Sequence, residues 1–490
     1  MLFLEEKLMN YNNSHQILRH SFCLICLYCL FSFDSFCQTK NGNESTSGDS
    51  LRVEQINIFG NRITKEKIII RELSFREGSL IAKDNIEQYL EKETNRLRNT
   101  NLFVTQEIAF YPTTENNIVI NVFLKERWYT FPIPLIELAD RSFNEWWTNQ
   151  NKDLSRIEYG LNFKRKNFRG RKEDLGLLLR FGFTKQLRLL YRVPFLDKKQ
   201  SLGLTIRTSY SENNNISYNT IGNKLQNVEY DKNIMRRQFD FGLALTKRVG
   251  FYDFHNIDIN YRNLKVADTV SYLNPEYFLN GQNLHRYFQL RYTYTHDFRD
   301  FSAYPLKGHL LNISLEKTGL GIFNDVDLLI FKTSYSKYMD LGKNFYLGSS
   351  FSGKVSLPET QPYIHMRALG YRQDFIRGYD LYVIEGQHFG LTKNTLRFKF
   401  LDEKMDAGKF IPIDQFNVIP IEMYFKGYID AGYVRNSTTN FYNEALSNKP
   451  LWGTGFGLDI VTFYNAVIRL EYSFNSRNEN GFFLYFSSDL

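Results

Sequence analysis

The feature that most constrains the fold is a long series of segments in which apolar and polar residues alternate. They begin at Thr130 and continue to the end of the chain, separated by polar or glycine-containing stretches. A period of two is typical of β-strands with one face in an apolar environment and the other in water. We place sixteen such segments, at residues 130–140, 156–168, 175–183, 186–195, 200–211, 234–248, 254–265, 285–297, 307–318, 326–339, 345–356, 389–400, 417–434, 453–461, 464–475 and 480–490.

The composition indicates where these strands lie. Aromatic residues make up 16% of the chain, with 43 Phe and 32 Tyr against 11 Pro, which favours pleated strands with aromatic girdles. The mean hydropathy is −0.40, and beyond the N-terminal region no segment holds the roughly twenty apolar residues of a membrane helix. We therefore exclude a helical membrane protein and predict a mainly β fold, a sixteen-stranded antiparallel transmembrane β-barrel over residues 130–490.

The connections between the predicted strands indicate the orientation of the barrel. Long polar connections follow the fifth, seventh, eleventh and thirteenth strands, whereas short turns follow the fourth, sixth, tenth and fourteenth. A barrel entered from the periplasm has its longer loops after odd-numbered strands. The stretch 401–416, after the twelfth strand, is an exception for which the pattern gives no account. The four long connections are 211–233, 266–284, 358–388 and 435–452.

The N-terminal region has the pattern of a secretory signal peptide. An apolar run at 22–33 follows Arg19 and His20 and precedes a polar stretch. We predict a signal peptide over 1–37 and a polar linker over 38–50. Because Phe36 stands where a lipoprotein cleavage site needs a small residue, we expect no lipid anchor.

Cysteine usage and charge exclude several classes of site. All four cysteines lie in or at the edge of the predicted signal peptide, so the mature chain has none, or one if cleavage precedes Cys37, which excludes disulfides, thiolate catalysis and cysteine metal sites. The histidines have no metal-ligand spacing, so we predict no metal, no cofactor and no enzymatic activity. The net charge of +8 is scattered among aromatic strands, which favours a polar lumen and charged rims over nucleic-acid binding. The four cysteines are Cys23, Cys26, Cys29 and Cys37.

Residues 51–127 have a pattern that the rest of the chain does not repeat, strand, helix, helix, strand, strand. Thr64 is a suitable N-cap for the first helix and Asp84 for the second. The strings VEQINIFGNRIT, EGSL, RLRNTNLF and IVINVFLKER resemble a POTRA domain, the periplasmic module of the BamA/TamA superfamily. The alternative is a generic α/β domain.

The turn and strand-entry residues of this domain also match the module. They are Gly60 and Asn61 in the turn and Leu102 and Phe103 at the step into the second strand. The resemblance implies one small α/β POTRA domain ahead of the barrel.

A second resemblance concerns the loop after the eleventh strand. Arg377-Gly378-Tyr379 resembles the arginine-glycine-aromatic motif of the same superfamily, in which the loop folds into the lumen. The string FKGYIDAG, from Phe425 to Gly432, matches the family's wall motif, which implies that Asp430 is the partner of Arg377. Relatives often have an acidic residue on the twelfth strand, where this chain has Arg397. The alternative for Arg377 is an ordinary surface arginine.

The resemblance to the BamA/TamA superfamily implies assembly or translocation of other proteins, by strand capture in the periplasm and a lateral barrel seam. The implied partners are the outer-membrane lipid bilayer, unfolded outer-membrane or secreted protein clients, and periplasmic or lipoprotein accessory subunits. Pro132 and Pro134 in the first strand each remove a ladder donor, which would weaken closure of that seam. The alternatives are a secretion translocator for a dedicated partner and a passive outer-membrane channel.

Overall fold

The computed structural model describes residues 50–140, 143–229, 233–323, 325–371, 373–406, 414–438 and 445–487. The predicted signal peptide and the predicted linker up to residue 49 lie outside these ranges, so both stay predictions. No helix in the described ranges has the length and apolar character needed to cross a membrane.

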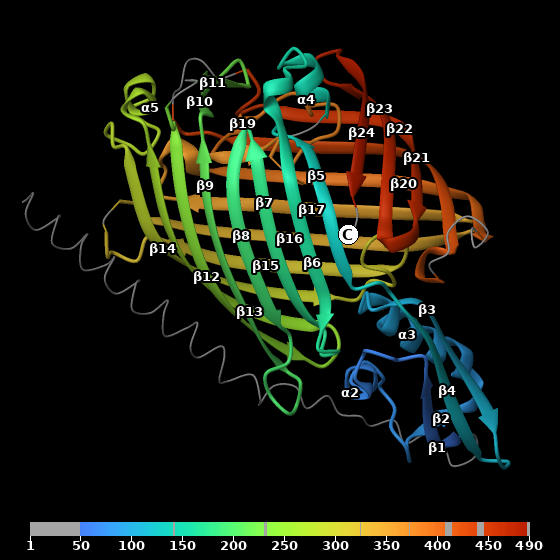
Figure 1. Ribbon diagram of the computed structural model, residues 1–490. Helices are drawn as coiled ribbons and strands as arrows, with labels where there is room; N and C mark the ends of the chain where they lie inside the picture. The colour runs from blue at the N-terminus through green and yellow to red at the C-terminus, as the bar shows by residue number, and fades with distance from the viewer. Residues whose placement is uncertain are drawn as a thin grey trace, which may run out of the picture. The chain divides into compact units, whose positions relative to one another are not determined.

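The first part of the described chain is a small α/β domain, coloured blue in Figure 1. Its sheet has the order β2-β1-β4-β3, in which β1 runs parallel to β4 and the other pairs are antiparallel. The helices pack on the sheet through a core that includes Val53, Leu97 and Ile120, all fully buried. The elements are β1 (Ser50–Phe59), α2 (Glu66–Ile70), β2 (Leu80–Ala82), η2 (Lys83–Asn85), α3 (Ile86–Asn99), β3 (Phe103–Pro112) and β4 (Asn117–Glu126).

Both predicted helix caps in this domain are wrong. The N-cap of α2 is Lys65 and that of α3 is Asn85, and neither makes a side-chain cap hydrogen bond. Thr64 instead hydrogen-bonds through its hydroxyl with Glu126, and Asp84 lies inside the 3₁₀ turn η2. A tertiary partner has therefore taken the hydroxyl that the local pattern assigned to the helix.

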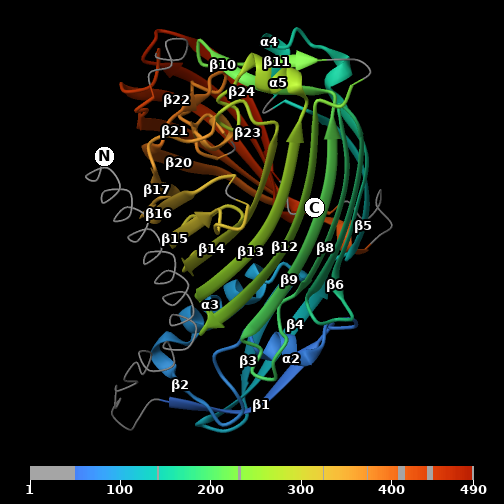
Figure 2. The same ribbon diagram turned by 90° about the vertical axis from the view of Figure 1, so that its left-hand side faces the viewer.

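The second part is a sheet of sixteen strands, each antiparallel to its neighbours, curved into a barrel wall (Figures 1 and 2). The predicted number and sequential order of strands are confirmed. The strands are β5 (Thr130–Leu138), β6 (Ile157–Phe168), β7 (Glu173–Gly182), β8 (Thr184–Val193), β9 (Leu202–Asn213), β12 (Arg236–Val249), β13 (Asp253–Val266), β14 (Leu284–Asp297), β15 (Gly308–Thr318), β16 (Leu328–Gly342), β17 (Phe345–Leu357), β20 (His388–Asp406), β21 (Val418–Arg435), β22 (Pro450–Thr462), β23 (Ala466–Asn475) and β24 (Asn480–Ser487).

The two faces of the wall differ as a lipid-facing barrel requires. On β12, Phe239, Phe241 and Leu243 are exposed on the outer face, while Asp240 between them forms an ion pair with Arg262 of β13. Charged side chains facing hydrocarbon are costly, whereas apolar ones are stabilised there. Alternation along β12 therefore places this ion pair in the lumen and the apolar side chains toward the lipid.

The long stretch 401–416 is explained by the strands on either side of it. β20 continues to Asp406 and β21 begins at Val418, and the two are paired over this extension. The prediction ended the twelfth strand at residue 400, so much of the apparent loop is in fact a long hairpin.

The connections that follow odd-numbered strands lie at one end of the barrel, where Figures 1 and 2 show α4, α5, β10 and β11. The α/β domain precedes the opposite end of β5, by the direction of the chain. Apolar side chains of several of these loops pack on one another, among them Ile216, Val270 and Tyr277. The elements are α4 (Phe143–Thr148), η3 (Leu154–Arg156), β10 (Asn215–Ile221), β11 (Lys224–Glu229), α5 (Asp268–Leu273), η4 (Tyr363–His365), β18 (Arg367–Leu369) and β19 (Ile384–Glu385).

The sheet does not close by backbone pairing within the described residues. Its terminal strands are β24 and β5, and neither has a hydrogen-bonded neighbour on its outer side. At the N-terminal end of β5, side chains contact the turn between β22 and β23 instead: the rings of Phe131 and Tyr464 lie 5.9 Å apart, and the Trp128 N–H donates to the Tyr464 hydroxyl at 3.0 Å. The barrel therefore has a seam between its first and last strands.

Candidate functional site: a loop docked inside the barrel

The loop between β17 and β20 folds back against the inner wall of the barrel. Its apolar residues Leu369, Ile376 and Tyr379 pack with Leu391 of β20 and Leu451 of β22 in one buried cluster. Burial of apolar side chains supplies most of the free energy that holds such a segment in place. The loop is thus a packed part of the barrel interior.

Arg377 and Asp430 form the polar centre of this contact. The Arg377 Nε donates to Asp430 Oδ2 at 2.8 Å, Nη2 donates to Oδ1 at 2.5 Å, and the main-chain N–H donates to Oδ2 at 3.1 Å. The same Nη2 reaches Thr395 Oγ1 at 3.0 Å, and the guanidinium lies 3.8 Å from the centre of the Tyr428 ring. A guanidinium is a planar fork, so two parallel bonds fix the direction as well as the position of the loop.

Glycines in the wall allow the loop backbone to approach. A Cβ at Gly453 would lie 1.9 Å from the carbonyl oxygen of Arg377, and a Cβ at Gly432 would lie 2.8 Å from Ile376 Cδ1. Gly378 adopts φ +90°, a left-handed conformation that side chains rarely tolerate. The loop backbone can therefore lie against the wall at Gly453 because that position carries no side chain, and Gly378 supplies the left-handed turn within the loop.

The same loop contacts the last two strands. The Asn475 amide donates to the Gly378 carbonyl at 2.8 Å, and the Tyr379 hydroxyl hydrogen-bonds with Ser476. The Tyr485 hydroxyl of β24 donates to Asp380. One end of the seam is consequently attached to the docked loop.

The predicted residues of the small domain lie at its junction with β5. A Cβ at Gly60 would overlap the Leu124 carbonyl at 1.9 Å, and Asn61 donates to the Thr64 carbonyl. Leu102 and Phe103 are buried, and their carbonyls accept from Tyr129 and Arg127 in the segment that leads into the barrel. Leu102 and Phe103 therefore contact the segment that joins the domain to the barrel, whereas these contacts of Gly60 and Asn61 lie within the domain.

The structure brings together Arg377, Gly378, Tyr379, Asp430 and Gly432, but not Phe425. Phe425 is 57% exposed on the outer face, because residues 425 and 430 of one strand have opposite parity. Arg397 takes no part in the docking of Arg377.

Arg397 donates instead to the Pro305 carbonyl, and the acceptor that β20 offers Arg377 is Thr395. Sequence reasoning missed Thr395, Gly453, Asn475 and Tyr485. The one available signal was the parity that Thr395 shares with Arg397, since both are inward-facing on β20.

The described residues contain no group of three or more His, Cys, Asp or Glu side chains that converges as metal ligands would. What the site can do is hold a loop across five neighbouring strands, β20 to β24, by ion pairing, hydrogen bonds and packing. Its role is structural, because these contacts fix the loop to the barrel wall.

A barrel of sixteen strands with an inward-docked loop, preceded by a small α/β domain, is the architecture of an outer-membrane protein with a periplasmic module. The family model for the Omp85 superfamily domain matches residues 167–484, and the POTRA model, described as a surface antigen variable number repeat, matches residues 51–127. The chain belongs to the Omp85 superfamily. It is an outer-membrane protein with its POTRA domain in the periplasm.

Two solved structures have a similar fold. BamA from Haemophilus ducreyi lacking POTRA domains 1–3 is 15% identical with a TM-score of 0.50, over 89% of this chain and 84% of that one. CdiB from Escherichia coli is 12% identical with a TM-score of 0.53, over 89% of this chain and 75% of that one. At these identities the likeness is one of fold. No curated protein matches the chain in sequence.

Proposed function

We propose that this protein inserts or translocates other proteins at the outer membrane without catalysing a covalent reaction, by capturing client strands in the periplasm and opening its seam to the membrane. The observation that carries the proposal is that β5 and β24 have no strand partner on their outer sides among the described residues, in an otherwise continuous ladder. An edge with free N–H and C=O groups can pair with an incoming strand. Within a bilayer such groups have no water to bind, so a client strand would satisfy them.

The prolines of β5 support an edge that closes weakly. Pro132 and Pro134 share one parity, and the β5–β6 ladder runs from Thr130 to Leu138 without a register shift. Because proline is tolerated where its nitrogen points away from the paired neighbour, we infer that both nitrogens face the seam. Two donors are then missing from the edge that β24 would have to meet.

The filling of the lumen argues against a wide passive channel. The docked loop occupies the wall from β20 to β24. From the other end, the turn between β14 and β15 inserts Tyr304, whose hydroxyl donates to Asp459 of β22 at 2.8 Å. Tyr304 packs on Tyr424 of β21, with ring centres 4.8 Å apart. An open pore would need both segments to leave.

The POTRA sheet offers edges for client capture before the barrel is reached. β2 is three residues long and pairs only with the start of β1, and Leu80 on β2 is 68% exposed. Backbone pairing at such an edge gives affinity without sequence specificity, which suits a protein that handles unfolded clients. Accessory subunits in the periplasm would bind the same domain.

A disulfide across the seam tests the proposal. Ile136 on β5 and Phe482 on β24 both face outward near the free edges, so cysteines there should bridge when the strands meet. With purified mature protein in liposomes, the oxidised variant should lose its ability to speed the folding of a urea-denatured barrel, and reduction should restore it. Because no ladder sets the register, Leu484 serves as a second partner for the cysteine at Ile136.

The matched control places the same bridge inside a closed ladder. Leu243 and Ile259 are direct partners on β12 and β13 and also face outward, so a disulfide there should leave activity intact. Unchanged activity with the seam bridged, together with steady ion conductance, would refute the proposal in favour of a channel. A third outcome would identify a dedicated secretion translocator. In that case the protein would not speed the folding of an unrelated barrel, but it would need an open seam to export one partner.

A further inference from the structure

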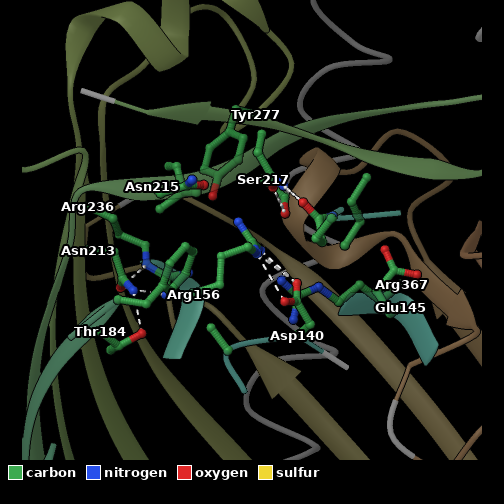
Figure 3. A pocket seen from close by; sticks show the side chains of 16 residues that line it. Asp140, Glu145, Arg156, Thr184, Asn213, Asn215, Ser217, Arg236, Tyr277 and Arg367 are labelled. Carbon is green, nitrogen blue, oxygen red and sulfur yellow. Dashed lines mark hydrogen bonds and ion pairs between the residues drawn. The ribbon is translucent and has the colours of Figure 1, made fainter. Parts of the chain in front are cut away.

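A polar cavity of about 180 Å³ lies among the loops at the end of the barrel opposite the POTRA connection (Figure 3). Its lining comes from five segments that are far apart in the sequence. The charged groups in the lining are three arginines and two acids: Arg156, Arg236, Arg367, Asp140 and Glu145.

One of the three arginines already has a full counter-charge. Arg156 donates from Nε and Nη2 to both oxygens of Asp140, at 2.7 to 3.1 Å, as the dashed lines in Figure 3 show. Its guanidinium also lies 4.5 Å from the centre of the Phe183 ring. This pair forms one wall of the cavity. The remaining question is what compensates the charges of the other two arginines.

Neither Arg236 nor Arg367 bonds to an acid in the described part of the chain. Arg236 donates to the uncharged Asn213 Oδ1, at 2.8 and 3.3 Å, and its other side-chain partner is the hydroxyl of Tyr277, which is also uncharged when protonated. Arg367 lies over the Tyr371 ring at 5.3 Å, and its guanidinium makes no hydrogen bond to any described residue. Arg236 lies on a barrel strand and Arg367 on a loop. Both line the same cavity, and their guanidinium groups have N–H donors left for a further ligand.

The two cations are close enough to repel each other, and Arg262 adds to the positive field on Arg236. Glu145 is the remaining carboxylate of the lining, and its Oε2 accepts from the Asn149 amide at 2.9 Å. Arg367 is an exposed residue, so water screens part of this repulsion, and an anion between the two guanidinium groups would offset the remainder.

We propose that this cavity binds a small oxyanion of the phosphate type, held between the guanidinium groups of Arg236 and Arg367. Planar guanidinium forks match the oxygen pairs of phosphate and carboxylate groups, and two of them can hold one tetrahedral anion. The inference is independent of the insertase proposal.

Anion binding would also stabilise the docked loop. Arg236 begins the wall strand β12, whereas Arg367 lies on β18, ten residues before Arg377 in the same loop. An anion between them therefore joins the loop to the wall at a second point. The phosphate could be a free ion or the head group of a lipid in the outer leaflet, since both approach the barrel from this end.

The test is titration calorimetry of the purified mature protein with inorganic phosphate at constant ionic strength. Arg236→Gln and Arg367→Gln should each weaken binding about tenfold or more, because each removes a charge-assisted contact. Saturating phosphate should raise the melting temperature of the wild-type protein by about 2–4 °C. Arg237→Gln is the matched control, since this neighbour carries the same charge but pairs with Glu212 instead.

Competition distinguishes the two sources of phosphate. Micelles that contain a phosphate-bearing lipid should displace inorganic phosphate if a head group is the ligand, and should leave binding unchanged if a free ion is the ligand, with zwitterionic micelles as the control. If Arg236→Gln fails to insert, Arg367→Gln decides the question, because Arg367 lies in a loop outside the ladder. The proposal is overturned if phosphate at about 10 mM does not bind the wild type, or if it binds the double variant with unchanged affinity.

Discussion

The carboxylate of Asp430 accepts three hydrogen bonds from Arg377, two from the guanidinium and one from the main-chain N–H of the same residue. Arg377 is 8% exposed and Asp430 is fully buried. Because both charges have left bulk water, each depends on the other for compensation. This ion pair therefore positions the loop, and loss of either residue alone should cost a large amount of folding free energy.

Removing either partner should undock the loop while the barrel stays inserted. We expect Arg377→Ala and Asp430→Asn each to destabilise the folded barrel by about 3–5 kcal/mol, since each leaves a buried polar group uncompensated. The double variant should be no less stable than the worse single variant, because the two residues act as one unit. The temperature at which the folded gel band disappears measures all three.

A lumen arginine outside the loop supplies the control. Arg291 of β14 pairs with Glu316 of β15, and its side chain is 40% exposed. Arg291→Ala should cost much less, since exposed pairs contribute about 0–1 kcal/mol. If the losses of stability in the Arg377 and Asp430 double-mutant cycle are additive, the two residues have no interaction free energy.

A methyl group at Gly453 should displace the loop as effectively as loss of the ion pair. The Cβ of Gly453→Ala would lie 1.9 Å from the Arg377 carbonyl oxygen, so the backbone of the loop has to move. Gly390→Ala on the neighbouring β20 is the control, because a Cβ there has no heavy atom within 4 Å. Greater proteolysis between residues 373 and 387 in the first variant only is the expected result, and equal resistance of both would contradict the docking argument.

The number and order of barrel strands follow from the sequence because a two-residue period is local and repeats sixteen times. The ends of strands are less certain. For example, β20 continues past residue 400 through Leu401–Asp406. The charged side chains of this segment do not show the strand pattern, although its backbone pairs with β21. Long-range pairing decides such ends, and a single segment does not contain that information.

The same distinction applies to the site. Asp430 could be connected with Arg377 only through family resemblance, because 53 residues separate them. Gly453 and Tyr485 could not be predicted at all, since their roles depend on the path of a loop across five strands. Thr64 failed as a helix cap for a similar reason, because Glu126 and Tyr129 bind its hydroxyl from distant positions.

Surface labelling should verify the orientation. Single cysteines at Gly222, in the loop after β9, and at Lys449, in the loop after β21, should react with an impermeant maleimide on intact cells. A cysteine at Glu87 on α3 of the POTRA domain should react only after the outer membrane is opened. Labelling of Glu87 on unbroken cells would reverse the orientation.

Acid should weaken the contact between the POTRA domain and the barrel, because that contact depends on the ionised carboxylate of Glu72. Arg248 donates to its two oxygens at 2.9 and 2.8 Å, and Lys172 lies 3.8 Å away. Although burial favours the neutral acid, these two cations lower the pKa of Glu72 to about 2. The stabilisation is thus present above the unfolded pKa, about 4.3, and is lost as the pH falls from there toward 2.

The difference of about two pKa units corresponds to about 3 kcal/mol at neutral pH. The urea midpoint of the wild type should therefore fall steeply between about pH 4.3 and 2, and that of Glu72→Gln should start lower at pH 7 and fall less over the same interval. Glu87→Gln, a substitution at an exposed position of α3, should follow the wild type. Parallel curves for the wild type and Glu72→Gln would mean that this carboxylate does not govern the acid sensitivity, because a neutral amide has no proton to gain.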